Sequence, residues 1–174
     1  WDVDDHRYLD WSAALGAVLL GHGHAEITKA IAVQLDKGIS FSLPTRLEAE
    51  VAELLCQVFP CGGPTGSVRF VKTGSEANAA ACRIARRVTG RDLILCCGYL
   101  GWHDWTIVRL PVHPGVPDGF GRFVQSFTYN QLASVDQAAA GRSVAAVFLE
   151  PVLFESPATG FLDGLRAWTR RAGA

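Results

Sequence analysis

The chain has 174 residues, a formal net charge of −1, 49% hydrophobic residues and 19% charged residues. This composition lets a chain fold around a core, which excludes intrinsic disorder, and the lack of a basic excess argues against a nucleic-acid partner. Apolar runs such as residues 13–20 are broken by glycines and are far shorter than the roughly 20 apolar residues that span a membrane.

Two further features of the composition concern the origin of the chain. It contains no methionine and begins at Trp1, so we expect it to be a piece of a longer protein. Its five cysteines are odd in number and follow no disulfide spacing. Cys96 and Cys97 are adjacent in an apolar run and should point to opposite faces of a strand as small buried residues. We therefore expect a reducing compartment, the cytoplasm.

The first third of the chain is predicted to hold one short strand and two helices. The strand is expected at 7–11 and the first helix at 25–37, where apolar residues recur at helical spacing. Thr45 and Glu48 form a capping box that starts the second helix. An apolar stripe follows on one face of that helix: Leu47, Val51, Leu54, Leu55 and Val58. Proline and glycine at 60–64 predict its end.

From residue 67 onward, predicted strands alternate with predicted helices. The strands are expected at 67–72, 92–97, 123–127 and 144–149. The helices are expected at 75–88, at 132–140 and from about 161, with a long loop rich in glycine, tryptophan and proline before residue 122. Apolar strands that alternate with helices indicate the α/β class, with a mostly parallel sheet covered by helices on both faces.

The segment Phe70–Asn78, FVKTGSEAN, carries the clearest chemical signal. A strand ends, a glycine allows a close turn, and a helix opens with a hydroxyl residue. The free N–H groups and the positive end of the helix dipole then form a site suited to a phosphate. Gly74 would leave room for the ligand and Ser75 would add a hydrogen bond. The alternative is an ordinary helix start in which Ser75 caps its own helix.

Two more candidates follow the ends of later strands. Tyr99 lies in the sequence GYLGWHDW, directly after the predicted strand 92–97, and Glu150 ends the strand 144–149. Ligands of open α/β sheets bind beyond the carboxyl ends of the strands, so Tyr99 is placed to stack on a flat ring and Glu150 to face the same cleft. The alternatives are a loop that buries its aromatic residues and a carboxylate that caps the next turn.

Taken together, these places resemble the class III (ω-type) aminotransferases, which are pyridoxal-phosphate enzymes of fold type I. Within that family the chain is most similar to the glutamate-1-semialdehyde aminomutase-like branch. The resemblance is carried by several motifs in the family's order and spacing: LGHGH at 20–24, GISFSLPT at 38–45, TGSEAN at 73–78 and AAVFLEP at 145–151.

The resemblance implies a role for each candidate residue. Gly74 and Ser75 would bind the phosphate of pyridoxal 5′-phosphate, Tyr99 would stack on the pyridine ring, and Glu150 would lie near that ring. The enzyme would move an amino group between an amino compound and an aldehyde or keto acceptor, as a homodimer. One departure is Leu100, which stands where the family usually has histidine.

The resemblance also implies two parts of the chain. Residues 1–44 would form an N-terminal segment with a substrate-entrance loop, and residues 45–174 an incomplete cofactor-binding large domain of fold type I, a mostly parallel sheet with helices on both faces. The family's chemistry needs a lysine bonded to the cofactor and a carboxylate at the pyridine nitrogen. In the family both follow the Glu-Pro strand.

None of the three lysines of the chain, Lys29, Lys37 and Lys72, matches the family's cofactor-binding position. We therefore expect the parent protein to be the enzyme, and we expect this chain alone to contain no catalytic residue and no metal site. The alternative is a stand-alone, degenerate module that binds a phosphate ligand or a partner.

Overall fold

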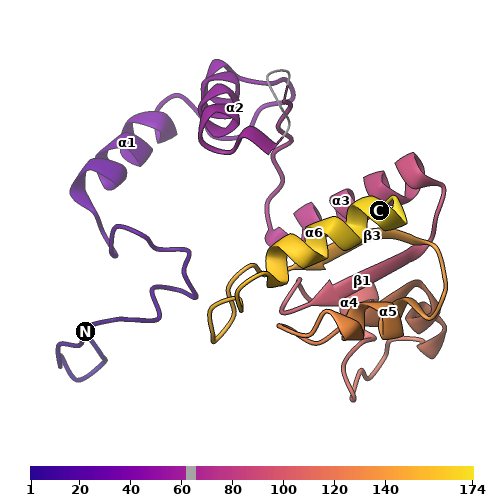
Figure 1. Ribbon diagram of the computed structural model, residues 1–174. Helices are drawn as coiled ribbons and strands as arrows, with labels where there is room; N and C mark the ends of the chain where they lie inside the picture. Colours follow the sequence, from indigo (N-terminus) through magenta and orange to yellow (C-terminus); the bar gives the residue numbers. More distant parts are fainter. Residues whose placement is uncertain (62–65) are drawn as a thin grey trace. The chain divides into compact units, whose positions relative to one another are not determined.

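The structure is a computed structural model that describes residues 1–61 and 66–174 (Figure 1). The chain divides into two compact units, Trp1–Val68 and Arg69–Ala174. The domain boundary expected between residues 44 and 45 stays a prediction, and the predicted helix end at Gly62, Gly63 and Pro64 lies outside the described residues. In the described part, no helix has the length and apolar character needed to cross a membrane.

The first unit contains two helices, α1 (Ala25–Leu35) and α2 (Arg46–Val58). The capping box predicted for α2 is confirmed, because Thr45 Oγ1 accepts a hydrogen bond from the backbone N–H of Glu48 and Glu48 accepts one from that of Thr45. Neither helix has a buried residue. The apolar stripe of α2 therefore forms as predicted along the helix, but it is not buried within the unit.

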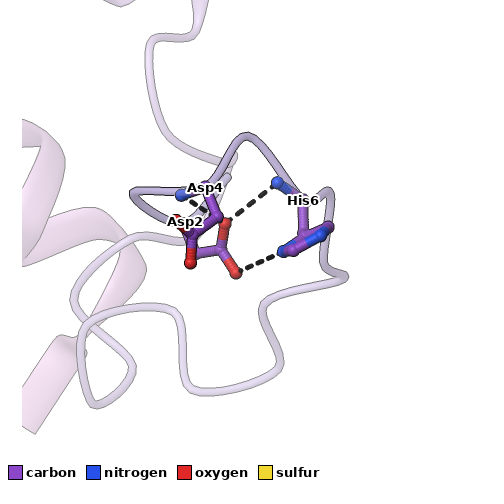
Figure 2. A group of neighbouring side chains, drawn as sticks. All are labelled: Asp2, Asp4 and His6. Atoms are coloured by element: carbon purple, nitrogen blue, oxygen red, sulfur yellow. Dashed lines mark hydrogen bonds and ion pairs between the residues drawn. The ribbon is translucent and has the colours of Figure 1, made fainter.

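The strand predicted at 7–11 is wrong, and a hydrogen-bonded turn precedes it (Figure 2). Oδ1 of Asp2 accepts hydrogen bonds from the backbone N–H groups of Asp4 and His6, at 3.0 and 2.9 Å. Oδ2 of Asp2 accepts from Tyr8 Oη at 2.9 Å. Such bonds from side chain to backbone compete with strand pairing, and no strand in the described residues runs beside this segment.

The second unit contains a three-stranded parallel sheet: β1 (Leu93–Cys97), β2 (Val124–Ser126) and β3 (Val144–Leu149), in the order β2-β1-β3. Its helices are α3 (Gly74–Thr89), α4 (Asp104–Ile107), the 3₁₀ helix η2 (Asp118–Phe123), α5 (Ala133–Ala139) and α6 (Phe161–Ala172). The α/β class and the parallel sheet are thus confirmed. The predicted loop before residue 122 is partly wrong, since α4 and η2 lie within it.

Strand β1 is the centre of the core, and its alternating side chains separate two faces. Leu95 and Cys97 pack in a cluster with residues of α5 and α6, whereas Ile94 and Cys96 pack with Cys82 of α3. The prediction that the two adjacent cysteines are buried on opposite faces is therefore confirmed. Burial raises the pKa of the Cys96 thiol to about 12, which keeps it protonated and unreactive at neutral pH.

The strand predicted at 67–72 is also wrong. Phe70 and Val71, its apolar centre, are 42% and 44% exposed. The backbone N–H of Lys72 donates to the Glu76 carboxylate at 2.8 Å and not to a neighbouring strand. An apolar segment becomes a strand only when another strand pairs with it, and the described residues contain none beside this one.

Candidate functional site

The predicted phosphate site lies at the first turn of α3, which starts at Gly74 because Thr73 is its N-cap. Thr73 Oγ1 accepts from the backbone N–H of Glu76 at 3.2 Å, and the Glu76 carboxylate accepts from that of Thr73 at 3.3 Å. The alternative in which Ser75 caps the helix is therefore wrong. The Ser75 hydroxyl is left available for other contacts.

The backbone at this helix start is open to a ligand. Gly74 and Ser75 occupy the first two helical positions, whose N–H groups have no acceptor within the helix. No acceptor for either group is found in the part of the chain that the structure describes. Among the described residues, a Cβ added to Gly74 would meet no atom within 4 Å, so there is free space beside this residue. Two N–H donors without a helical acceptor and the positive end of a 16-residue helix thus lie next to that space.

The turn that follows β1 packs directly on Ser75. Ser75 is 8% exposed, and its Oγ accepts from the backbone N–H of Trp102 at 3.3 Å. Gly101 has φ +107°, and a Cβ there would collide with Ser75 Oγ and lie 2.9 Å from Ser75 Cα. Glycine is therefore required at residue 101 both by its backbone conformation and by the closeness of α3.

Glu150, at the end of β3, holds the same turn from the other side. Its Oε2 accepts from the backbone N–H of Tyr99 at 2.9 Å. A Cβ at Gly98, whose φ is +85°, would collide with this carboxylate. Glu150 therefore caps the turn of the neighbouring strand. The Tyr99 side chain is 69% exposed, so its ring is not used in packing.

Three residues that the sequence interpretation missed complete the support of this turn. Asn78 Nδ2 donates to Leu100 O at 3.0 Å. Thr106, 1% exposed, donates its hydroxyl to Gly101 O at 2.7 Å, and Arg109 Nη2 donates to the carbonyl of residue 98 at 3.2 Å. Asn78 could have been found, because it lies one helical turn after Gly74 in the TGSEAN motif. Thr106 and Arg109 carry no signal in the sequence.

Leu100, the departure from the family pattern, is 6% exposed and packs in the core cluster that contains Ile94 and Cys96. It therefore contributes to packing where the family's usual histidine would offer a polar group. The turn of residues 98–102 joins three site residues that were predicted from separate segments: Ser75, Tyr99 and Glu150.

The first unit contains another group of polar side chains, Asp2, Asp4 and His6, close together in Figure 2. All three are exposed. The pKa of Asp2 is lowered, first by the hydrogen bond from the backbone N–H of His6 and further by those from Tyr8 and the His6 ring. These bonds account for the grouping as a structured turn, and we assign no ligand to it.

The family model described as aminotransferase class-III matches residues 1–174. Among curated proteins, the glutamate-1-semialdehyde 2,1-aminomutase of Chloroflexus aurantiacus is 39% identical over 194 residues, which cover 100% of this chain and 42% of that protein. The chain therefore spans less than half the length of this relative.

Two solved structures give the same result. The FumI protein of Sphingopyxis sp. MTA144, in its PLP internal aldimine form, matches with 29% identity and a TM-score of 0.87 over 100% of this chain and 43% of that one. An omega-transaminase from Sphaerobacter thermophilus matches with 27% identity and a TM-score of 0.83 over 95% of this chain and 42% of that one.

Proposed function

The chain belongs to the class-III aminotransferase family, and we propose that it supplies the phosphate-binding part of an enzyme that moves an amino group with pyridoxal 5′-phosphate. The observation that carries the proposal is the pair of N–H groups at Gly74 and Ser75, which have no acceptor within the helix and lie beside the free space at Gly74 and the turn that presents Tyr99. Similar proteins, which include an aminomutase, a transaminase and a protein in its PLP internal aldimine form, support the same cofactor and the same class of reaction.

In this proposal each residue has a distinct task. The N–H groups of Gly74 and Ser75 bind the phosphate, with the Ser75 hydroxyl as a further donor. The exposed ring of Tyr99 stacks on the flat pyridine ring. Glu150 orients that tyrosine through its hydrogen bond to the Tyr99 N–H, 2.9 Å long.

The residues present fit the chemistry of the cofactor. A phosphate dianion needs converging N–H donors with no side chain in front of them, and Gly74 leaves that space free. The ring needs an exposed aromatic neighbour, which Tyr99 offers. When bound, pyridoxal phosphate supplies an electron sink for the transfer of an amino group. The residues of this chain bind and orient it.

We further propose that the chain alone does not complete the reaction, because none of its lysines takes the family's cofactor-bound position. For the whole protein we propose a small amino donor, an aldehyde or keto acceptor, and a homodimer. A reducing, cytoplasmic setting is supported by the five cysteines, all free and three of them buried.

The sharpest test is Gly74→Ala, assayed by equilibrium binding of pyridoxal 5′-phosphate to the purified chain. The added methyl group meets no protein atom, so folding should be unchanged while phosphate affinity falls at least tenfold. Ser75→Ala should weaken binding by a similar amount, since a hydrogen bond to a charged group contributes about 1.5–3 kcal/mol. Thr169→Ala is the matched control, because its hydroxyl bonds only to the Arg166 carbonyl of its own helix.

Pyridoxal without its phosphate serves as the control ligand. If pyridoxal binds as tightly as pyridoxal 5′-phosphate, the phosphate site is wrong. If inorganic phosphate binds as tightly as pyridoxal 5′-phosphate, the pyridine ring adds no affinity. That result would favour the stand-alone phosphate-binding module. Borohydride reduction followed by mass spectrometry tests the lysine argument, and cofactor trapped on Lys72 would contradict it.

A further inference from the structure

A second open hollow lies at the opposite edge of the sheet, where β1 and β3 begin. It has a volume of about 760 Å³, and its lining includes Arg91, Asp92, Arg122, Phe123, Arg142 and Ser143. Helix α3 ends here, at Thr89, and its 16 residues place this edge about 24 Å from the helix start. The hollow is thus separate from the proposed cofactor site.

Three guanidinium groups converge on the two residues Arg122 and Phe123. Arg122 Cζ lies 4.4 Å from the centre of the Phe123 ring, and Arg86 Cζ lies 5.6 Å from the same centre. Arg86 Nη2 also donates to Phe123 O at 3.3 Å. Arg142 Nη1 donates to Arg122 O at 2.8 Å. Of these three arginines, Arg122 and Arg142 line the hollow, and Arg86 supports the Phe123 backbone and ring beside it.

The hydrogen-bond acceptors of these arginines are neutral carbonyl oxygens. Arg91 joins them, with Nη1 donating to Val144 O at 2.9 Å and to carbonyls at the end of α6. In the part of the chain that the structure describes, none of the four arginines forms an ion pair with a carboxylate. Asp92 is the only carboxylate lining the hollow in that part of the chain.

The groups around the hollow balance only part of the positive charge of its arginines. The carboxyl ends of α3 and α6 offset about half a charge each, and Asp92 offsets one more. Arg91, Arg122 and Arg142 line the hollow, so about one positive charge remains at this shallow site. Arg91 is half-buried and therefore less screened by salt. A bound anion would balance this charge.

We propose that this arginine hollow binds a compact polyanion of the pyrophosphate class. Guanidinium groups match phosphate oxygens with paired, planar donors. The Ser143 hydroxyl offers one more donor, and the volume lies within the range of about 300–1,000 Å³ that is usual for small-ligand sites. The net charge of −1 for the whole chain disfavours nucleic acid as the source of the phosphates. Free pyrophosphate and a nucleoside diphosphate share the proposed chemistry.

Calorimetric titration with inorganic pyrophosphate and with ADP, at constant ionic strength, tests the proposal. Both Arg122 and Arg142 are exposed, so the double variant Arg122→Gln, Arg142→Gln should fold normally, which circular dichroism checks. It should bind pyrophosphate at least tenfold more weakly than the unaltered chain. Arg166→Gln, an exposed arginine of α6, is the matched control and should bind unchanged. Tighter binding of ADP than of pyrophosphate would point to the nucleotide as the natural source.

The same titrations separate this hollow from the start of α3. Saturable pyrophosphate binding should persist in Gly74→Ala and should be lost when the two arginine substitutions are added to it, whereas the arginine variants alone should leave pyridoxal 5′-phosphate binding intact. Pyrophosphate binding that is lost with Gly74→Ala but kept in the double arginine variant would overturn the proposal. Absence of saturable binding would overturn the proposal as well. So would loss of binding when the buffer salt is replaced by sodium chloride at the same ionic strength, because the hollow would then not distinguish pyrophosphate from chloride.

Discussion

Helices α2 and α3 begin with the same device and yet have different surroundings. Thr45 caps α2 and Thr73 caps α3, each paired with a glutamate three positions later. Helix α3 buries Ser75 and Cys82 within the second unit, whereas α2 buries no residue. A local capping signal is thus sufficient to start a helix in either unit, but it does not decide whether the helix is buried.

The two units differ in the same way as these helices. Every residue of β1 in the second unit is buried, whereas the apolar side chains along α1 and α2 are largely exposed. Because burial of apolar surface is the main stabilising contribution to folding, the second unit should carry most of the stability of the chain. The predictions below test this difference, beginning with the largest expected effect.

The core of the second unit should respond far more strongly to truncation than α2. Leu95, fully buried in β1, should lose about 2–5 kcal/mol of unfolding free energy when changed to alanine. Leu54→Ala in α2, where the side chain is 57% exposed, should change it by about 0.5 kcal/mol or less. Urea unfolding of both variants measures the difference. Equal losses would show that α2 is buried in solution.

Stability should fall in alkali because of a buried thiol. The Cys96 pKa rises from an ordinary 9.0 to about 12 in the folded chain, chiefly through desolvation. Above pH 9 the unfolded chain releases this proton first, so stability present below pH 9 is lost as the pH rises toward 12. The expected slope is at most about 1.4 kcal/mol per pH unit.

Unfolding measured from pH 8 to 11 checks this slope, with Cys96→Ala as the variant and Cys61→Ala, an exposed cysteine, as the control. Cys96→Ala lowers stability at pH 8 by leaving a cavity, but it should flatten the alkaline decline. An unchanged slope in Cys96→Ala would assign the decline to other groups.

Removal of either helix cap should cost a similar amount of free energy, but one loss should affect a whole unit and the other a single helix. Thr73→Ala and Thr45→Ala should each cost about 1 kcal/mol, because each leaves one backbone N–H, that of Glu76 or Glu48, without its acceptor. For Thr73 the loss should appear in the unfolding free energy of the whole second unit. For Thr45 it should appear only as faster hydrogen exchange of α2 amides. A Thr45→Ala effect on β1 exchange would contradict the expectation that the loss is local to α2.

The smallest effect concerns a pair between half-buried His113 and exposed Asp118, in the segment between β1 and β2. His113 Nε2 lies 2.9 Å from Asp118 Oδ1, and this hydrogen bond is the main cause that raises the His113 pKa. The pair should stabilise the segment below pH about 6.5 and lose that contribution as the pH rises through the raised pKa. NMR titration of His113 should show its midpoint fall in Asp118→Asn. An unchanged midpoint would show that the pair does not form in solution.

The parts of the fold that could be predicted are those that depend only on the residues of one short segment. The capping box at Thr45, the left-handed glycine Gly90 that ends α3, and the continuous apolar runs of β1 and β3 are such segments. The strands predicted at 7–11 and 67–72 failed, because a strand also needs a neighbour, and no local pattern supplies one.

The candidate site shows the same difference between local patterns and contacts with distant residues. The TGSEAN motif placed Gly74 and Ser75 at a helix start, and the strand ends placed Tyr99 and Glu150 at the same edge of the sheet. The contacts that join them could not be predicted, because the hydrogen bond between the Tyr99 N–H and Glu150 connects residues 51 positions apart. Their roles with the cofactor remain proposals.

The turn after β1 has a consequence for how substitutions in this chain would be tolerated. Gly98 and Gly101 are each confined by a neighbour, Glu150 in one case and Ser75 in the other. Any side chain there would push one of these two residues away from the edge of the sheet. A saturation mutagenesis screen should therefore rank both glycines among the least tolerant positions of the turn, although neither brings a functional group to the site.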